Sequence, residues 1–145
     1  MRIYLETSVL VEYCFGRKLE PNKYKSVKAL FDKINSKDIT GVVSFYSLHE
    51  MFIFAIENFS SDISRYIGKT AFEEILKNRV ELIPLLSRED RIQYSSSIKL
   101  DDSSDIPHAI LATIEKCDCI VTYDSHFKAI KMLKILTPDE LLQFI

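Results

Sequence analysis

Four acidic side chains, far apart in the sequence, occupy positions from which they could share one metal ion. Glu6 and Asp124 each follow a predicted strand, Asp105 begins a predicted helix, and Glu50 lies two turns into another helix. Ligands of parallel sheets bind beyond the carboxyl ends of the strands, so we expect the four carboxylates to converge there. Such a cluster drives its members toward protonation unless a cation neutralises them. Oxygen ligands suit Mg²⁺ or Mn²⁺, and such an ion can activate water and stabilise phosphoryl transfer.

Each of these acids also has an ordinary structural explanation. Glu6 and Asp124 could be solvent-facing acids at strand ends, and Asp105 could be only a helix cap, because acids are common at both places. Glu50 is harder to explain in this way, since its helix is apolar nearly all round and an unpaired glutamate there would be costly. The coincidence of the four predicted positions therefore favours a shared metal site.

Strands and helices are predicted to alternate along the chain. The predicted strands cover residues 2–5, 39–43, 80–85, 119–122 and 133–136. Helical spacing of apolar residues or a helix-capping residue predicts helices near residues 9–14, 24–34 and 62–78, and directly after Ser44, Ser87, Asp105, Asp124 and Thr137. This alternation requires crossover connections, and it predicts an α/β fold in which a parallel sheet of four to five strands is covered by helices on both faces.

The chain is 145 residues long, with 47% hydrophobic residues, 28% charged residues and a formal net charge of -2. This length predicts a single domain over residues 1–145, since nothing in the pattern resembles a linker or a repeat. Charged or polar residues interrupt every apolar run well before the roughly 20 residues that a membrane-spanning helix needs. Glu6 and Glu12 also break any secretion signal, so we expect a cytoplasmic protein without a membrane partner.

The remaining composition excludes two further classes of protein. Cys117 and Cys119 are one residue apart and the cysteine count is odd, so a disulfide-stapled domain is not expected. Gly16, Gly41 and Gly68 are too widely spaced for a glycine-rich loop that cradles phosphates. Nucleotide binding through such loops is therefore excluded.

The segments that carry the acids resemble motifs of PIN domains. They are residues 4–10 (YLETSVL), 43–50 (VSFYSLHE), 105–109 (DIPHA) and 120–127 (IVTYDSHF). Each motif alone is weak, but the four occur in order, at suitable spacing, and the resemblance extends over essentially the whole chain. Among PIN domains, the chain resembles the VapC-like toxins, which are small PIN ribonucleases paired with antitoxins.

This resemblance implies a PIN-like three-layer fold and metal-dependent hydrolysis of RNA phosphodiesters. It implies that Glu6, Glu50, Asp105 and Asp124 hold Mg²⁺ or Mn²⁺ and that Thr122 supplies a hydroxyl near the metal or its water. Ser8 is a weaker candidate for the same task. The implied partners are an RNA substrate, a cognate antitoxin and a second copy of the chain. A homodimer would agree with the helix that is apolar on all sides, and we expect the aromatic residues Tyr46, Phe54 and Phe59 to be exposed and to belong to the dimer face.

One residue departs from the pattern of the family. The first strand of PIN domains usually ends in aspartate, whereas here it is followed by Glu6. The extra methylene displaces the carboxylate by about 1.5 Å, and displacements of that size can cost on the order of 100-fold in rate. A catalytically attenuated PIN domain that binds RNA or protein is therefore the main alternative. A housekeeping RNA-processing or DNA-directed nuclease is a further one.

Other polar residues are weaker candidates. Asp101 and Asp102 precede Asp105 in a polar loop, and Asp102 is considered as an auxiliary ligand, although a solvated loop acid is the default. The three histidines show no pairing at metal-ligand spacing. His108 follows Asp105 by one helical turn and could support the cluster, but a packing or surface histidine is the simpler interpretation.

Overall fold

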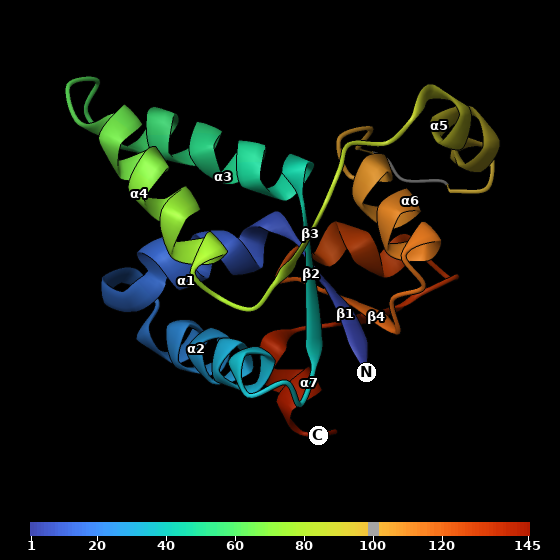
Figure 1. Ribbon diagram of the computed structural model, residues 1–145, viewed down its shortest axis with the longest axis horizontal. Helices are drawn as coiled ribbons and strands as arrows, with labels where there is room; N and C mark the ends of the chain where they lie inside the picture. Colours follow the sequence, from blue (N-terminus) through green and yellow to red (C-terminus); the bar gives the residue numbers. More distant parts are fainter. Residues whose placement is uncertain (99–101) are drawn as a thin grey trace.

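The computed structural model describes residues 1–98 and 102–145, which form a parallel five-stranded sheet between layers of helices (Figure 1). The strands are β1 (Arg2–Leu5), β2 (Thr40–Ser44), β3 (Glu81–Ile83), β4 (Cys119–Val121) and β5 (Lys134–Leu136), in the order β3-β2-β1-β4-β5. The helices are α1 (Thr7–Leu19), α2 (Pro21–Asn35), α3 (Phe45–Asn58), α4 (Ser64–Leu76), α5 (Arg88–Ser95), α6 (Ile106–Ile114) and α7 (Pro138–Leu142), with the short 3-10 helix η1 (Ser125–Ala129). The predicted α/β fold is confirmed.

The central strand, β1, sets the edge at which the polar residues gather. Ile3, Tyr4 and Leu5 are fully buried, as expected of a parallel strand covered on both faces. Tyr4 pairs with Val42 of β2, and Leu5 pairs with Val121 of β4, both in parallel register. The carboxyl ends of these three strands therefore lie side by side, and the residues that follow them start from the same edge.

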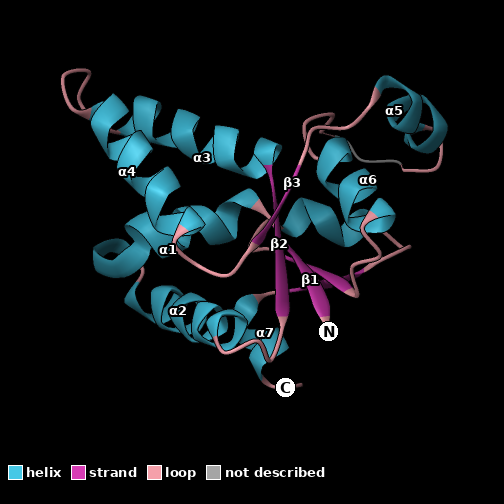
Figure 2. Ribbon diagram, viewed as in Figure 1, coloured by secondary structure: helices cyan, strands magenta, loops and turns pink. Residues whose placement is uncertain are grey.

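The sheet separates two apolar clusters, because successive side chains of a strand point to opposite faces. Ile3 and Leu5 pack in one cluster with residues of α1, α2, α3, α4 and α7, whereas Tyr4 packs in the other with residues of α6 and η1. Figure 2 shows this division, with α1 to α4 on one side of the sheet and α5 and α6 on the other. Since α6 leads into the beginning of β4, its own beginning at Asp105 lies toward the carboxyl edge of the sheet.

Local signals predicted the helix starts better than the ends of elements. Ser44 and Ser87 each accept a hydrogen bond from the backbone N–H three residues later, at 3.1 and 3.0 Å, and Thr137 forms the predicted capping box before α7. By contrast, the sequence pattern extends the helix after Ser87 as far as Ile98, whereas α5 ends at Ser95, because no side chain of this helix is buried and packing does not prolong it. The edge strand β3 is shorter than the predicted residues 80–85, since it has a neighbour on one side only.

The apolar helix α3 is covered mostly by its own chain. Its Phe54 and the following Phe59 lie against Phe15 of α1, with ring centroids 5.5 and 5.6 Å apart, and are half-buried. Tyr46 packs against the cluster around α6 and is also half-buried. These aromatic rings were expected to be exposed, whereas α3 instead exposes the aliphatic Ile53 together with Phe45 and Ile56. Among the described helices, none is long and apolar enough to cross a membrane.

Gly41 in β2 lies directly against Ile34 of α2. A Cβ at this residue would lie 2.7 Å from Cδ1 of Ile34, and both residues are buried. We therefore expect Gly41→Ala to lower the free energy of unfolding by about 1–3 kcal/mol, the usual cost of an overpacked core.

Urea denaturation measures this effect, and the double variant Gly41→Ala/Ile34→Val tests its cause. The valine lacks the clashing Cδ1, so the double variant should lose less stability than the sum of the two single variants. Additive losses would show that this contact does not limit the approach of α2.

Candidate active site

All four acids predicted to share a site line one cleft at the carboxyl edge of the sheet. The cleft has a volume of about 470 Å³, and its lining includes Glu6, Glu50, Asp105 and Asp124. The remaining described lining consists of Thr7, Ser8, Val11, Glu12, Lys23, Phe54, Asp102, Ser104 and Tyr123. Six carboxylates thus face a single lysine in the described lining, and the cleft is strongly negative. Asp101, the other loop acid considered above, lies outside the described residues.

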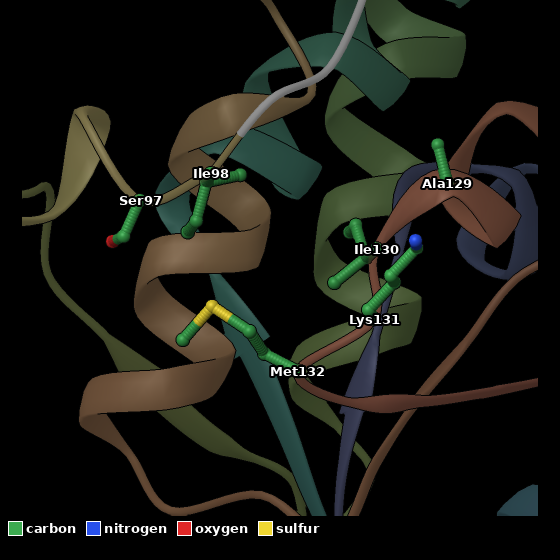
Figure 3. A pocket seen from close by; sticks show the side chains of 6 residues that line it. All are labelled: Ser97, Ile98, Ala129, Ile130, Lys131 and Met132. Atoms are coloured by element: carbon green, nitrogen blue, oxygen red, sulfur yellow. The ribbon is translucent and has the colours of Figure 1, made fainter.

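A second hollow, of about 270 Å³, lies between the residues after α5 and the end of η1 (Figure 3). Ile98, Ile130 and Met132 make much of its lining apolar, and Lys131 is the charged residue in the described lining. Its described walls hold no carboxylate, histidine or cysteine that could bind a metal ion, so the acidic cleft is the better candidate site.

Glu6 is held inside the protein instead of facing solvent. Its side chain is 6% exposed, and Oε2 accepts hydrogen bonds from the Ser8 N–H at 2.9 Å, the Ser8 hydroxyl at 2.5 Å and the Thr122 hydroxyl at 2.7 Å. The Thr122 oxygen also accepts from the Asp124 N–H at 2.9 Å. Since the one proton of Thr122 goes to Glu6, this threonine connects two acids of the cleft.

Asp105 is not simply a helix cap. It occupies the N-cap position of α6, but its side chain makes no capping hydrogen bond. Within the described part of the chain, its Oδ2 is buried and has no hydrogen-bond partner. Burial, followed by the negative charges of Asp124, Asp102 and Glu6, raises the pKa of Asp105 from 3.8 to about 6. This carboxylate therefore carries the least compensated charge of the four acids.

Glu50 is paired, in contrast to the unpaired state considered from the sequence. Its Oε2 accepts a hydrogen bond from the Thr7 hydroxyl and lies 3.2 Å from Nε2 of His108. Burial by itself raises the pKa of Glu50, but the contacts with His108 and Thr7 outweigh it and lower the pKa below the usual value. His108 is 1% exposed, so it is not a surface histidine, and its contact with Glu50 was not found by sequence reasoning.

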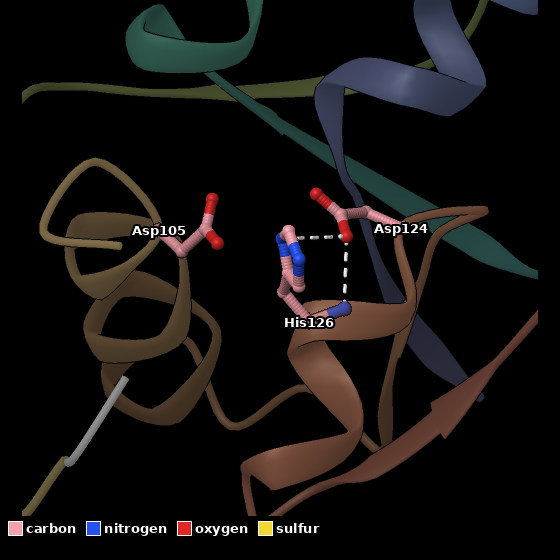
Figure 4. Close-up of side chains that lie close together, drawn as sticks. All are labelled: Asp105, Asp124 and His126. Atoms are coloured by element: carbon pink, nitrogen blue, oxygen red, sulfur yellow. Dashed lines mark hydrogen bonds and ion pairs between the residues drawn. The ribbon is translucent and has the colours of Figure 1, made fainter. Parts of the chain in front are cut away.

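Asp124 and Asp105 approach one another together with a histidine that the sequence analysis did not select. One ligand atom from each of Asp105, Asp124 and His126 lies within 4.8 Å of the others (Figure 4). Asp124 Oδ1 accepts from the His126 N–H at 2.8 Å and lies 3.3 Å from its Nδ1. Glu6 and Glu50 line the same cleft but are not part of this tightest group. The spacing of His126, two residues after an acid at a strand end, was the available signal.

The donors in the cleft fit a hard divalent cation. Carboxylate oxygens predominate, one exposed imidazole is available, and Asp105 presents an oxygen without a partner in the described structure. Mg²⁺ and Mn²⁺ prefer such oxygen-rich surroundings. The residues that would hold the ion are Asp105 and Asp124, with Glu6, Glu50 and His126 in reach of the same cleft.

Comparisons with solved structures find the same fold in bacterial proteins. A chain of the VapBC2 complex of Rickettsia felis, crystallised with a DNA fragment from its promoter, superimposes with a TM-score of 0.66 at 20% identity over 94% of this chain and 98% of that chain. VapC20 of Mycobacterium tuberculosis, described as a sarcin–ricin loop cleaving toxin, gives a TM-score of 0.66 at 14% identity, over 88% and 93%. FitAcB of Neisseria gonorrhoeae gives a TM-score of 0.65 at 18% identity, over 94% of this chain and 97% of that chain.

At these identities the structural likeness shows the fold alone. A search of the curated proteins found no match. The model of one sequence family, described as PIN domain, matches residues 2–126, which include β1 to β4 and all four acids of the cleft. The chain therefore belongs to the PIN domain family.

Proposed function

We propose that the protein is a Mg²⁺- or Mn²⁺-dependent endoribonuclease and the toxin of a type II toxin–antitoxin pair. The observation that carries this proposal is the buried Oδ2 of Asp105, which lacks a partner in the described structure and lies among the carboxylates of one cleft. Uncompensated charge of this kind is relieved by a bound cation. Membership of the PIN family and the structural likeness to VapC20, a toxin that cleaves RNA of the sarcin–ricin loop, support RNA as the substrate.

Hydrolysis in this cleft needs no nucleophilic side chain. A divalent ion, when bound, lowers the pKa of a coordinated water and neutralises charge on the phosphate. The side chains of this protein keep the ligands in position for that chemistry. Glu6 and Glu50 are each fixed by two side-chain donors, and Asp124 is fixed by the backbone N–H of His126. Asp105 contributes the charge that has the greatest need of a cation.

The proposed protein partner is an antitoxin. Structures similar to this chain are described as VapBC and FitAB complexes. In this protein an apolar hollow of about 590 Å³ adjoins the acidic cleft, and Phe54 lines both. Arg17 and Lys18 also line the hollow, so it suits an apolar segment with acidic neighbours. A small reading frame for such a protein directly upstream of the gene would support the pairing, and its absence would favour a housekeeping nuclease.

A homodimer also stays a prediction. The exposed side chains of α3 named above, Phe45, Ile53 and Ile56, form the apolar surface that a second copy would cover.

The second candidate function is a catalytically attenuated PIN domain that binds RNA or protein. Glu6 is the observation in its favour, because its Oε2 already accepts three hydrogen bonds and leaves Oε1 for a cation. Its longer side chain also places the carboxylate differently from the aspartate that is usual in the family.

Loss of either central acid should remove RNA cleavage. We expect Asp105→Asn and Asp124→Asn each to lower the cleavage rate by on the order of 100-fold or more, because each removes a charge that holds the ion. EDTA should abolish cleavage by the unaltered protein, and Mn²⁺ should restore it. Asp38→Asn, at an exposed position, is the matched control and should leave the rate unchanged. Undiminished cleavage by highly purified variants would refute the assignment.

The charge of Asp105 should destabilise the metal-free protein at neutral pH. Its folded pKa of about 6 exceeds the ordinary 3.8, so the folded state binds this proton more tightly and loses stability as pH rises between these values. After allowance for partial exposure the effect is on the order of 1 kcal/mol, or about 3 °C in Tm.

We therefore expect Asp105→Asn to raise the Tm of the EDTA-treated protein by about that amount at pH 7.5, and not at pH 4. Added Mn²⁺ should reverse the order, since it should stabilise the unaltered protein more than the variant. Thermal scans at the two pH values measure both effects. Equal Tm values at pH 7.5, with and without Mn²⁺, would contradict the proposed cation site.

Substitution of Glu6 separates the two candidate functions. If the longer side chain attenuates the nuclease, Glu6→Asp should raise turnover by about 10- to 100-fold while leaving RNA affinity unchanged, because it shortens the reach of one ligand. Single-turnover cleavage and RNA binding in EDTA give the two quantities. If neither form cleaves RNA in the presence of Mn²⁺, the binding function is the better conclusion.

A further inference from the structure

A chain of buried polar groups runs from the centre of the sheet to the acidic cleft. His108 of α6 lies with Nδ1 at 2.9 Å from the Tyr4 hydroxyl and with Nε2 at 3.2 Å from Glu50 Oε2. The Tyr4 hydroxyl is in turn 2.6 Å from the Ser44 hydroxyl. Tyr4, Ser44 and His108 are at most 1% exposed, so solvent does not compete for these contacts.

The hydrogen bonds of this chain run in one direction when the imidazole is neutral. With Nε2 protonated toward Glu50, Nδ1 accepts from the Tyr4 hydroxyl, and the Tyr4 oxygen can then accept from the Ser44 hydroxyl. Ser44 accepts from the Ser47 N–H at 3.1 Å, which leaves its own proton available for Tyr4. The Tyr4 hydroxyl, with the Ser47 hydroxyl at 3.4 Å from the same Nδ1, therefore favours the tautomer that presents an N–H to the carboxylate.

Packing holds the imidazole ring in the same orientation. Its centroid lies 5.8, 6.1 and 6.2 Å from those of Tyr4, Tyr46 and Phe127, and each pair is arranged edge to face. The ring is thus fixed by β1, α3 and η1, while its own backbone belongs to α6. Glu50 is 35% exposed at its side chain and faces the cleft, so it is the end of the chain that a ligand can reach.

We propose that His108, oriented by Tyr4, is a positioning residue for Glu50 and thereby sets the affinity of the cleft for a divalent cation. This inference rests on the proposed function, since it requires that the cleft binds such an ion. A buried histidine needs both nitrogens paired in any role, so the distinguishing feature here is that one partner is Glu50, a carboxylate that faces the cleft. Outer hydrogen-bond partners of metal ligands are worth about 10- to 100-fold in metal affinity or activity.

The test is the Kd for Mn²⁺, measured by electron paramagnetic resonance on the full chain. His108→Leu, which removes both nitrogens, should weaken Mn²⁺ binding by about 10- to 100-fold. His108→Gln keeps an N–H donor near the position of Nε2 and should recover part of that loss. Tyr4→Phe removes a single hydroxyl far from the ion and should weaken binding by about 3- to 10-fold, the effect of one hydrogen bond. Tyr13→Phe, which removes a hydroxyl that contacts Asn78 away from the lining of the cleft, is the control and should leave the Kd unchanged.

A double-variant cycle separates positioning from a general loss of structure. In the background of Glu50→Gln, His108→Leu should cause little further loss of Mn²⁺ affinity, because the residue through which it acts is already altered. A loss that persists undiminished in that background would overturn the proposal. So would an unchanged Kd in both Tyr4→Phe and His108→Leu, with the fold of each verified by thermal denaturation.

The metal-dependent function and the positioning role of His108 are contradicted by different results. If the unaltered protein binds no Mn²⁺, the metal-dependent function fails, and this inference with it. If the unaltered protein binds Mn²⁺ and cleaves RNA but the variants of Tyr4 and His108 bind the ion equally well, only the positioning role fails. A ring N–H signal of His108 in the NMR spectrum that shifts in Glu50→Gln would independently support the hydrogen bond.

Discussion

Carboxylates that cannot move apart determine the character of this cleft. Parallel hydrogen bonding fixes the ends of β1, β2 and β4 at one edge of the sheet, and α6 begins beside them because it must return to the start of β4. The acids carried by these elements are therefore held close together although their charges repel. Three of them share their charge with donors, whereas Asp105 keeps an oxygen without a partner in the described structure and a pKa near 6. The repulsion is concentrated where a cation can relieve it.

Small polar residues make this arrangement tolerable to the fold. Thr7, Ser8 and Thr122 direct their hydroxyl groups at carboxylates, and their short side chains leave the cleft open. The same groups restrict the acids to particular orientations before any ligand arrives, which reduces the entropy lost on binding. At Asp105 charge and stability are in opposition, because its raised pKa means that the ionised carboxylate weakens the folded protein, whereas the contacts of Glu50 lower its pKa.

Membership of the PIN family accounts for the fold that brings the acids together. It does not determine the individual side-chain contacts of this chain. Identities of 14–20% to the structures named above show the fold and leave the individual contacts to be read from this protein. Glu6 illustrates the difference, since its Oε2 is engaged by three donors. The connection of Glu50 through His108 to Tyr4 likewise depends on residues outside the group of four acids.

The spacing of apolar residues and the helix-capping residues in the sequence determined the order of strands and helices along the chain, and with it the parallel sheet. The four acids that face one cleft could be predicted because ligands of parallel sheets bind beyond the carboxyl ends of the strands. Tertiary structure alone decided the surroundings of Glu50 and Asp105. Glu50 meets His108 across two helices, and Asp105 meets Asp124 and His126 across the sheet edge, so no local spacing encodes either contact. The lengths of β3 and α5 were also set by neighbours, or by their absence among the described residues. The strength of a hydrogen bond or of a charge–charge interaction depends on the distance between the two groups. For groups far apart in the sequence, that distance is set only by the folded structure.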